Sequence, residues 1–175
     1  MSNYRAITFF DLDGTLLDSR SKITPEVANA MEALKKNNVL PVIATGRTEA
    51  EIKHIMSDAG ITSAVTMNGS YISVDGKEIH SEKFSTDECQ RMLDHVTSQG
   101  HQLSFYNHQN IWCTGHDQTM IEAYDFIHST VPEINPYAFL DHPINMLLIL
   151  SKSGDEYYHE HFPELTFYRN GPYSI

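Results

Sequence analysis

Short apolar runs alternate with helical spacings over the first 70 residues of the chain. The runs at residues 6–10, 39–44 and 64–67 have the length and composition of buried strands. Between them, apolar residues recur at helical spacing and predict two amphipathic helices, one beginning at Pro25 and one ending before Gly60. Strands joined by helices in this way lie parallel in one sheet, so the sequence predicts an α/β unit.

The pattern changes after Asn68. Alternating apolar positions around Asp75 and Gly76 predict a hairpin with a tight turn, and Ser85 and Glu88 have the spacing of a capping box before a further helix. Later segments predict strands at residues 103–106, 111–114, 146–150 and 165–168, and a helix around Met120 to Ile127. We therefore expect a separate α+β domain over about residues 83–168.

The composition excludes several classes of partner. The chain has 175 residues, of which 12 are Lys or Arg and 23 are Asp or Glu, so the net charge of −11 argues against nucleic-acid and anionic-membrane partners. Its longest apolar stretch, residues 144–150, is far below the roughly 20 residues of a membrane-spanning helix. Cys89 and Cys113 are isolated, and the N-terminus lacks the features of a secretory signal, so we expect a cytoplasmic protein.

Two aspartates directly follow the first apolar run. Asp11 and Asp13 flank Leu12, and in an extended segment their side chains project the same way while Leu12 points elsewhere. Two neighbouring carboxylates repel each other unless a proton or a cation lies between them, and a hard cation such as magnesium fits this need. The alternative is a solvated turn, because Asp and Gly14 are also common turn residues.

A second polar motif ends the next apolar run. Thr45, Gly46 and Arg47 follow residues 39–44, so the Thr45 hydroxyl and the following amides can hold phosphoryl oxygens at the start of a helix. The alternative is that Thr45 only caps the helix and Gly46 only fills the loop. The first motif, found at the end of the neighbouring strand, favours the phosphoryl site.

The sequence Phe-Asp-Leu-Asp-Gly-Thr-Leu at residues 10–16, followed by Ala-Thr-Gly-Arg at residues 44–47, resembles the haloacid dehalogenase-like superfamily, and most closely its Cof-like sugar-phosphatase branch. The resemblance implies an α/β fold, in which an incomplete three-layer, Rossmann-like parallel-sheet core carries an inserted α+β cap. Residues 1–82 would form the core, residues 83–168 the cap, and residues 169–175 the start of the return to the core.

The resemblance also implies roles for individual residues. Asp11 would be the nucleophile and a Mg²⁺ ligand, and Asp13 the general acid/base with its main-chain carbonyl on the metal. One carboxylate must be ionised to attack while the other carries a proton for the leaving oxygen. The residues expected to contact phosphate or substrate are Leu12, Thr45, Gly46, Arg47 and Asn68.

These features predict a magnesium-dependent phosphatase that acts on small phosphorylated metabolites through an aspartyl-phosphate. The family completes its site with a lysine after the cap and an acidic motif beyond it, whereas this sequence ends at Ile175. We therefore expect the natural chain to continue, and the chain as written to be a poor catalyst that is able to self-associate through its first strand. The alternatives are a phosphomutase that uses the same aspartates, which would not release inorganic phosphate, and an inactive binding module.

Overall fold

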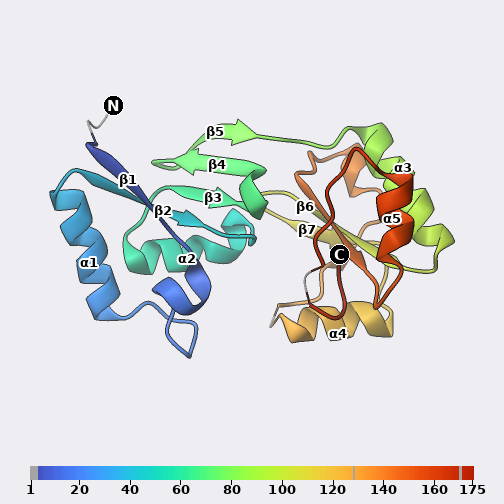
Figure 1. The fold of residues 1–175 in the computed structure, drawn as a ribbon, viewed down its shortest axis with the longest axis horizontal. Coiled ribbons are helices and arrows are strands. Elements are labelled where there is room, and N and C mark those ends of the chain that lie inside the picture. Colours follow the sequence, from blue (N-terminus) through green and yellow to red (C-terminus); the bar gives the residue numbers. More distant parts are fainter. Residues whose placement is uncertain (1–3, 128, 170) are drawn as a thin grey trace. The chain divides into compact units, whose positions relative to one another are not determined.

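The computed structural model describes residues 4–127, 129–169 and 171–175. The chain divides into two compact units, Met1–Glu82 and Lys83–Ile175 (Figure 1). No helix among the described residues has both the length and the apolar character needed to cross a bilayer.

The first unit is built on a five-stranded sheet in the order β1-β2-β3-β4-β5. Its strands are β1 (Ala6–Phe10), β2 (Val39–Ala44), β3 (Ala64–Thr66), β4 (Tyr71–Val74) and β5 (Lys77–Ser81). The first three strands are parallel, and β4 and β5 form an antiparallel hairpin. Asp75 and Gly76 connect the hairpin with φ values of 49° and 72°, which is the left-handed geometry that tight hairpin turns require. The expected α/β fold is thus confirmed.

Two helices cover one face of this sheet. In α1 (Pro25–Lys36), the Thr24 side chain accepts a hydrogen bond from the first turn and Pro25 occupies the first helical position. The second helix, α2 (Glu49–Ala59), ends at Gly60, which adopts the left-handed conformation with φ 64°. Both helices contribute to a single core cluster with β2 and the turn after β1, so the described residues of this unit form two layers rather than three.

The outer position of β1 leaves part of its surface uncovered. It pairs with β2 on one side and is an edge strand of the sheet. Ile7 and Phe9, which alternate with the residues facing the helices, are 56% and 60% exposed. A parallel sheet normally buries both faces, so these two side chains mark an unprotected apolar surface.

The second unit is an α+β domain with its own core. Its mixed sheet has the order β8-β7-β6-β9, formed by β6 (Gln102–Tyr106), β7 (Ile111–Cys113), β8 (Glu133–Ile134) and β9 (Met146–Leu150). Its helices are α3 (Thr86–Ser98), α4 (Gln118–Phe126) and α5 (Asp155–His161). The predicted capping box at the start of α3 is present, with reciprocal hydrogen bonds between Ser85 and Glu88. A separate hydrophobic cluster joins α3, the sheet and α5.

The predicted strand at residues 165–168 is wrong. This segment is irregular, although Leu165 and Phe167 pack against the hydrophobic cluster, which accounts for their alternating apolar pattern. The edge of β9 that a further strand would need is already occupied, because Ile149 and Ile175 exchange hydrogen bonds of 2.9 and 3.0 Å. The resemblance assigns residues 169–175 to the start of the return to the core, whereas residues 173–175 pair with the sheet of the second unit.

Candidate active site

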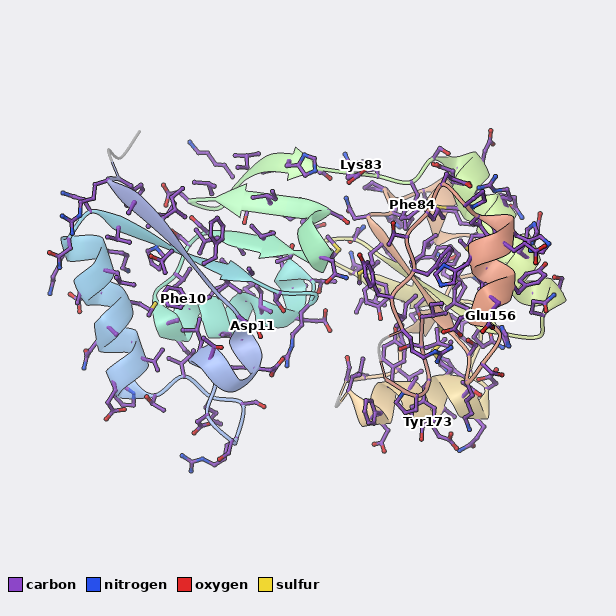
Figure 2. The ribbon with its side chains drawn as sticks, viewed as in Figure 1. Phe10, Asp11, Lys83, Phe84, Glu156 and Tyr173 are labelled. Atoms are coloured by element: carbon purple, nitrogen blue, oxygen red, sulfur yellow. The ribbon has the colours of Figure 1, made fainter. Side chains whose placement is uncertain are left out.

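Asp11 lies directly after β1 with an extended backbone, at φ −72° and ψ 163°. Figure 2 shows it at the carboxyl end of that strand, next to Phe10. Its side chain is exposed, and among the described residues it has no hydrogen-bond or ion-pair partner. An ionised carboxylate that no cation or donor engages is available to a substrate or a metal ion.

An open hollow of about 310 Å³ lies in front of Asp11. It is lined by residues in or just after the C-terminal ends of the three parallel strands: Asp11, Ala44, Thr45, Gly46, Val65, Asn68 and Gly69. The carboxyl ends of parallel strands are the usual place for ligand crevices in open α/β sheets. Four residues singled out from the sequence, Asp11, Thr45, Gly46 and Asn68, thus come together in one concave site.

The loop after β2 is fixed by a hydrogen bond to β3 and another within the loop. The Thr45 amide donates to the Val65 carbonyl at 3.0 Å, and the Thr45 hydroxyl accepts from the Arg47 amide at 3.2 Å. Helix α2 begins immediately afterwards with a capping box between Thr48 and Glu51. Thr48 rather than Thr45 therefore caps the helix, so Thr45 is left for another role. The Thr-x-x-Glu spacing that signals this cap is visible in the sequence, but sequence reasoning missed it.

The loop after β3 has an unusual backbone. Met67, Asn68 and Gly69 have φ values of 49°, 56° and 101°, and the Met67 side chain is fully buried. A left-handed conformation costs a residue with a side chain roughly 1–2 kcal/mol. Strained residues of this kind cluster at functional sites, where the surrounding structure holds them in place. The amide of Met67 donates to the Arg47 carbonyl at 3.1 Å, which ties this loop to the loop after β2.

Gly46 is required by a close approach between these two loops. A Cβ atom at this position would lie 2.9 Å from the Asn68 side-chain oxygen Oδ1. Any larger residue would therefore displace the Asn68 carboxamide from the hollow. The sequence motif marks Gly46 as a phosphoryl-site glycine, but only the fold shows which side chain it accommodates.

Three predicted site residues lie outside the hollow. The chain does not stay extended after Asp11, because it turns within η1 (Leu12–Leu16), which the Leu17 amide closes by donating to the Leu12 carbonyl at 3.0 Å. Leu12 is fully buried in the core, so its side chain is not available to a ligand. The Asp13 carboxylate is bound instead by Arg47, whose Nη2 lies 2.9 and 3.0 Å from the two oxygens.

The donor atoms at the site are suited to a hard cation. Magnesium is typically bound by one or two protein carboxylates, with substrate phosphate and water completing its shell. The unpaired Asp11 carboxylate beside an open hollow fits this chemistry. Within the ranges that the structure describes, no cluster of three or more His, Cys, Asp or Glu side chains could hold a metal by itself. The Asp11 carboxylate could therefore serve as one ligand of such an ion, with phosphate oxygens in the hollow.

The model of the haloacid dehalogenase-like hydrolase family matches residues 8–175 of the chain. The chain belongs to this family. Among curated relatives, YkrA of Bacillus subtilis is 23% identical over 164 residues, which are 93% of this chain and 64% of YkrA. Phosphatase YwpJ of the same organism is 25% identical over 126 residues, which are 70% of this chain and 44% of YwpJ. The chain therefore spans less than two thirds of these relatives.

Solved structures share the fold of this haloacid dehalogenase-like chain. A protein of Geobacillus kaustophilus is 25% identical, with a TM-score of 0.90 over 98% of this chain and 67% of that protein. The subclass IIB sugar phosphatase BT4131 is 24% identical, with a TM-score of 0.73 over 97% of this chain and 67% of its own. The resemblance inferred from the two motifs is thus confirmed at the level of the family.

Proposed function

We propose that this chain belongs to a magnesium-dependent phosphatase that hydrolyses small phosphorylated metabolites, such as sugar phosphates, through an aspartyl-phosphate on Asp11. The observation that carries the proposal is the unpaired Asp11 carboxylate, which shares a hollow with the Thr45 hydroxyl and the loop before α2. The names of related proteins support the reaction class, because YwpJ is a phosphatase and BT4131 is a sugar phosphatase. A further relative, 28% identical over 86 residues, is the HMP-PP phosphatase of Klebsiella pneumoniae.

The two aspartates divide the chemistry between them. A carboxylate oxygen of Asp11 attacks phosphorus, and the bond from phosphorus to the leaving oxygen breaks. Asp13 supplies the proton that the leaving oxygen needs, and the substrate departs as an alcohol. Water then attacks the phosphoryl group on Asp11, passes its proton to Asp13, and releases inorganic phosphate while both carboxyl groups return to their first state.

The Thr45 hydroxyl and the Gly46 amide orient the transferred phosphoryl group. Preorganised donors of this kind favour the charge that develops on phosphoryl oxygens in the transition state, and losing one typically costs on the order of 100- to 1000-fold in rate. Magnesium, when it is bound by the Asp11 carboxylate and the Asp13 main-chain carbonyl, would offset the repulsion between the nucleophile and the phosphate. In this proposal the second unit, residues 83–175, is the cap that selects the substrate.

The experiment is a phosphate-release assay with p-nitrophenyl phosphate and a panel of sugar phosphates, with magnesium and with a chelator in its place. We expect magnesium-dependent release of inorganic phosphate, which a phosphomutase would not produce. Transfer of phosphate between sugar positions without release would favour the phosphomutase. Binding of sugar phosphates without either reaction would favour an inactive binding module, and both of these results would overturn the proposal.

A further inference from the structure

The ion pair between Arg47 and Asp13 joins the two sequence motifs. Arg47 Nη2 donates to both Asp13 oxygens at 2.9 and 3.0 Å, across 34 residues of sequence. The Arg47 side chain is 37% exposed and that of Asp13 is 64% exposed. Exposed ion pairs contribute little to stability, so stability alone gives no reason for this one.

The main chain of Arg47 is fixed at both ends of the residue. Its amide donates to the Thr45 hydroxyl at 3.2 Å, and its carbonyl accepts from the Met67 amide at 3.1 Å. The guanidinium therefore extends from a segment held between the two loops that line the hollow. Asp13, in contrast, lies in the turn after β1, and its side chain is 64% exposed. The fixed partner in this pair is Arg47, and the partner that needs orienting is Asp13.

We propose that Arg47 is a positioning residue, which orients and stabilises the Asp13 carboxylate that forms as the protonated Asp13 gives its proton to the leaving oxygen, and that it is not a ligand of the phosphoryl group. This corrects the sequence-based expectation of a phosphate contact, and it rests on the proposed function. The geometry supports it because the guanidinium lies against Asp13, and Arg47 is not among the residues that line the hollow. One guanidinium nitrogen, Nη2, contacts both carboxylate oxygens, and the rigid plane of the guanidinium limits the orientation of the carboxylate more than the flexible ammonium of a lysine would.

The two roles predict different kinetics for Arg47→Gln. An orienting role matters most when the leaving oxygen is a poor leaving group that needs a proton, and least for p-nitrophenolate, which leaves without one. We expect kcat on a sugar phosphate to fall by about 100-fold and kcat on p-nitrophenyl phosphate by less than about fivefold. The inhibition constant of inorganic phosphate should change less than about twofold. Arg47→Lys should recover part of the lost rate on the sugar phosphate.

Arg20→Gln is the matched control. Arg20 Nη2 lies 3.4 Å from Asp18 Oδ2 in an exposed ion pair, and neither residue lines the hollow. This substitution should leave both rates unchanged. Equal loss of kcat on both substrates with Arg47→Gln, or inhibition by phosphate weakened by more than about tenfold, would identify Arg47 as a phosphate ligand and overturn the proposal.

A second measurement tests the pair without turnover. In ¹⁵N-labelled protein, the Arg47 guanidinium signals should shift in Asp13→Asn and stay in place in Asp18→Asn. If Asp13→Asn leaves the signals unchanged, the pair does not exist in solution and this inference fails, whatever the activity of the wild-type chain. Transfer of phosphate between sugar positions without release of inorganic phosphate would instead contradict the proposed function, and with it the reaction that Arg47 serves.

Discussion

Single residues in the three loops of the hollow decide what this chain can bind. Strand alternation predicts that the Asp11 and Asp13 side chains project the same way. Asp11 lines the hollow, whereas the chain turns immediately afterwards and the Asp13 carboxylate lies against Arg47. The pairing of Asp13 with Arg47 could not be predicted, since 34 residues separate them and only the parallel order of β1 and β2 brings their ends together. The hydroxyl, glycine and carboxylate chemistry of the hollow could be predicted, because each residue directly follows an apolar strand.

Gly46→Ala tests the packing of the hollow. The new Cβ would lie 2.9 Å from Asn68 Oδ1, so the Asn68 side chain must move, and we expect inorganic phosphate to bind at least about tenfold more weakly. Competitive inhibition by phosphate measures this. Gly115→Ala is the control, because its Cβ would meet the Gln102 amide oxygen at 3.0 Å in the second unit. Equal effects of the two substitutions on phosphate binding would contradict the assignment of the hollow.

Asp13→Asn tests the division of labour between the two aspartates. Asparagine supplies no proton to a leaving alkoxide, so turnover of sugar phosphates should fall by about 100- to 10,000-fold. The protein should still take phosphate from an activated donor, because Asp11 is intact. Rapid-quench measurement of phosphoryl-enzyme from p-nitrophenyl phosphate checks this, and a variant that forms no adduct at all would refute the proposed roles.

At the scale of secondary-structure elements, short-range signals are the most reliable guide. Thr24 marks the start of α1, Gly60 marks the end of α2, and the Ser85–Glu88 pair marks the start of α3. These positions could be predicted because capping depends on residues within one turn of each other. The irregular segment at residues 165–168 could not be recognised from its pattern, since a strand also needs a free neighbour. Here residues 173–175 already occupy the edge of β9.

The capping box of α3 gives a pH-dependent contribution to stability. Hydrogen bonds from the Ser85 hydroxyl and amide, at 2.6 and 2.7 Å, lower the pKa of Glu88 below its ordinary value. A carboxylate with a lowered pKa in the folded protein stabilises it fully above the pKa of the unfolded chain, and this stabilisation is lost as the pH falls through the folded value. We expect Glu88→Gln to lower the free energy of unfolding by about 0.5–1 kcal/mol at pH 7.

Urea denaturation at several pH values measures this effect. The difference between wild type and Glu88→Gln should shrink as the pH falls below the ordinary glutamate pKa of about 4.3, and it should close once the pH is below the lowered pKa of the folded state. Asp87→Asn is the control, because it removes a charge from the same first turn without touching the capping box. A difference that persists undiminished at low pH would show that the ionised Glu88 does not stabilise the helix.

At the scale of the whole molecule, the first strand is an edge strand with two exposed apolar side chains. The parallel sheet could be predicted from the alternation of strands and helices, but the exposure of Ile7 and Phe9 depends on which strands lie beside β1. Unpaired edges with apolar side chains promote pairing with another chain. We therefore propose that the 175-residue chain self-associates through β1.

Phe9→Lys tests this association. Phe9 is 60% exposed, and burying a side chain of its kind contributes about 1.5–3 kcal/mol, so the substitution should weaken self-association by about tenfold or more. Sedimentation velocity over a range of concentrations measures the association. Ile79→Lys is the control, since Ile79 is 63% exposed on β5, the opposite edge strand. If both variants associate as the wild type does, β1 is not the interface.

The most direct test of the account as a whole is to trap the phosphoryl group on the protein. The chain is incubated with magnesium and p-nitrophenyl phosphate, quenched in acid, digested and sequenced by mass spectrometry. We predict a single added phosphoryl group on Asp11, and none in Asp11→Asn, whose turnover should fall by more than about 1000-fold. Phosphate found on Asp13, or turnover retained by Asp11→Asn, would contradict the central claim that Asp11 is the nucleophile.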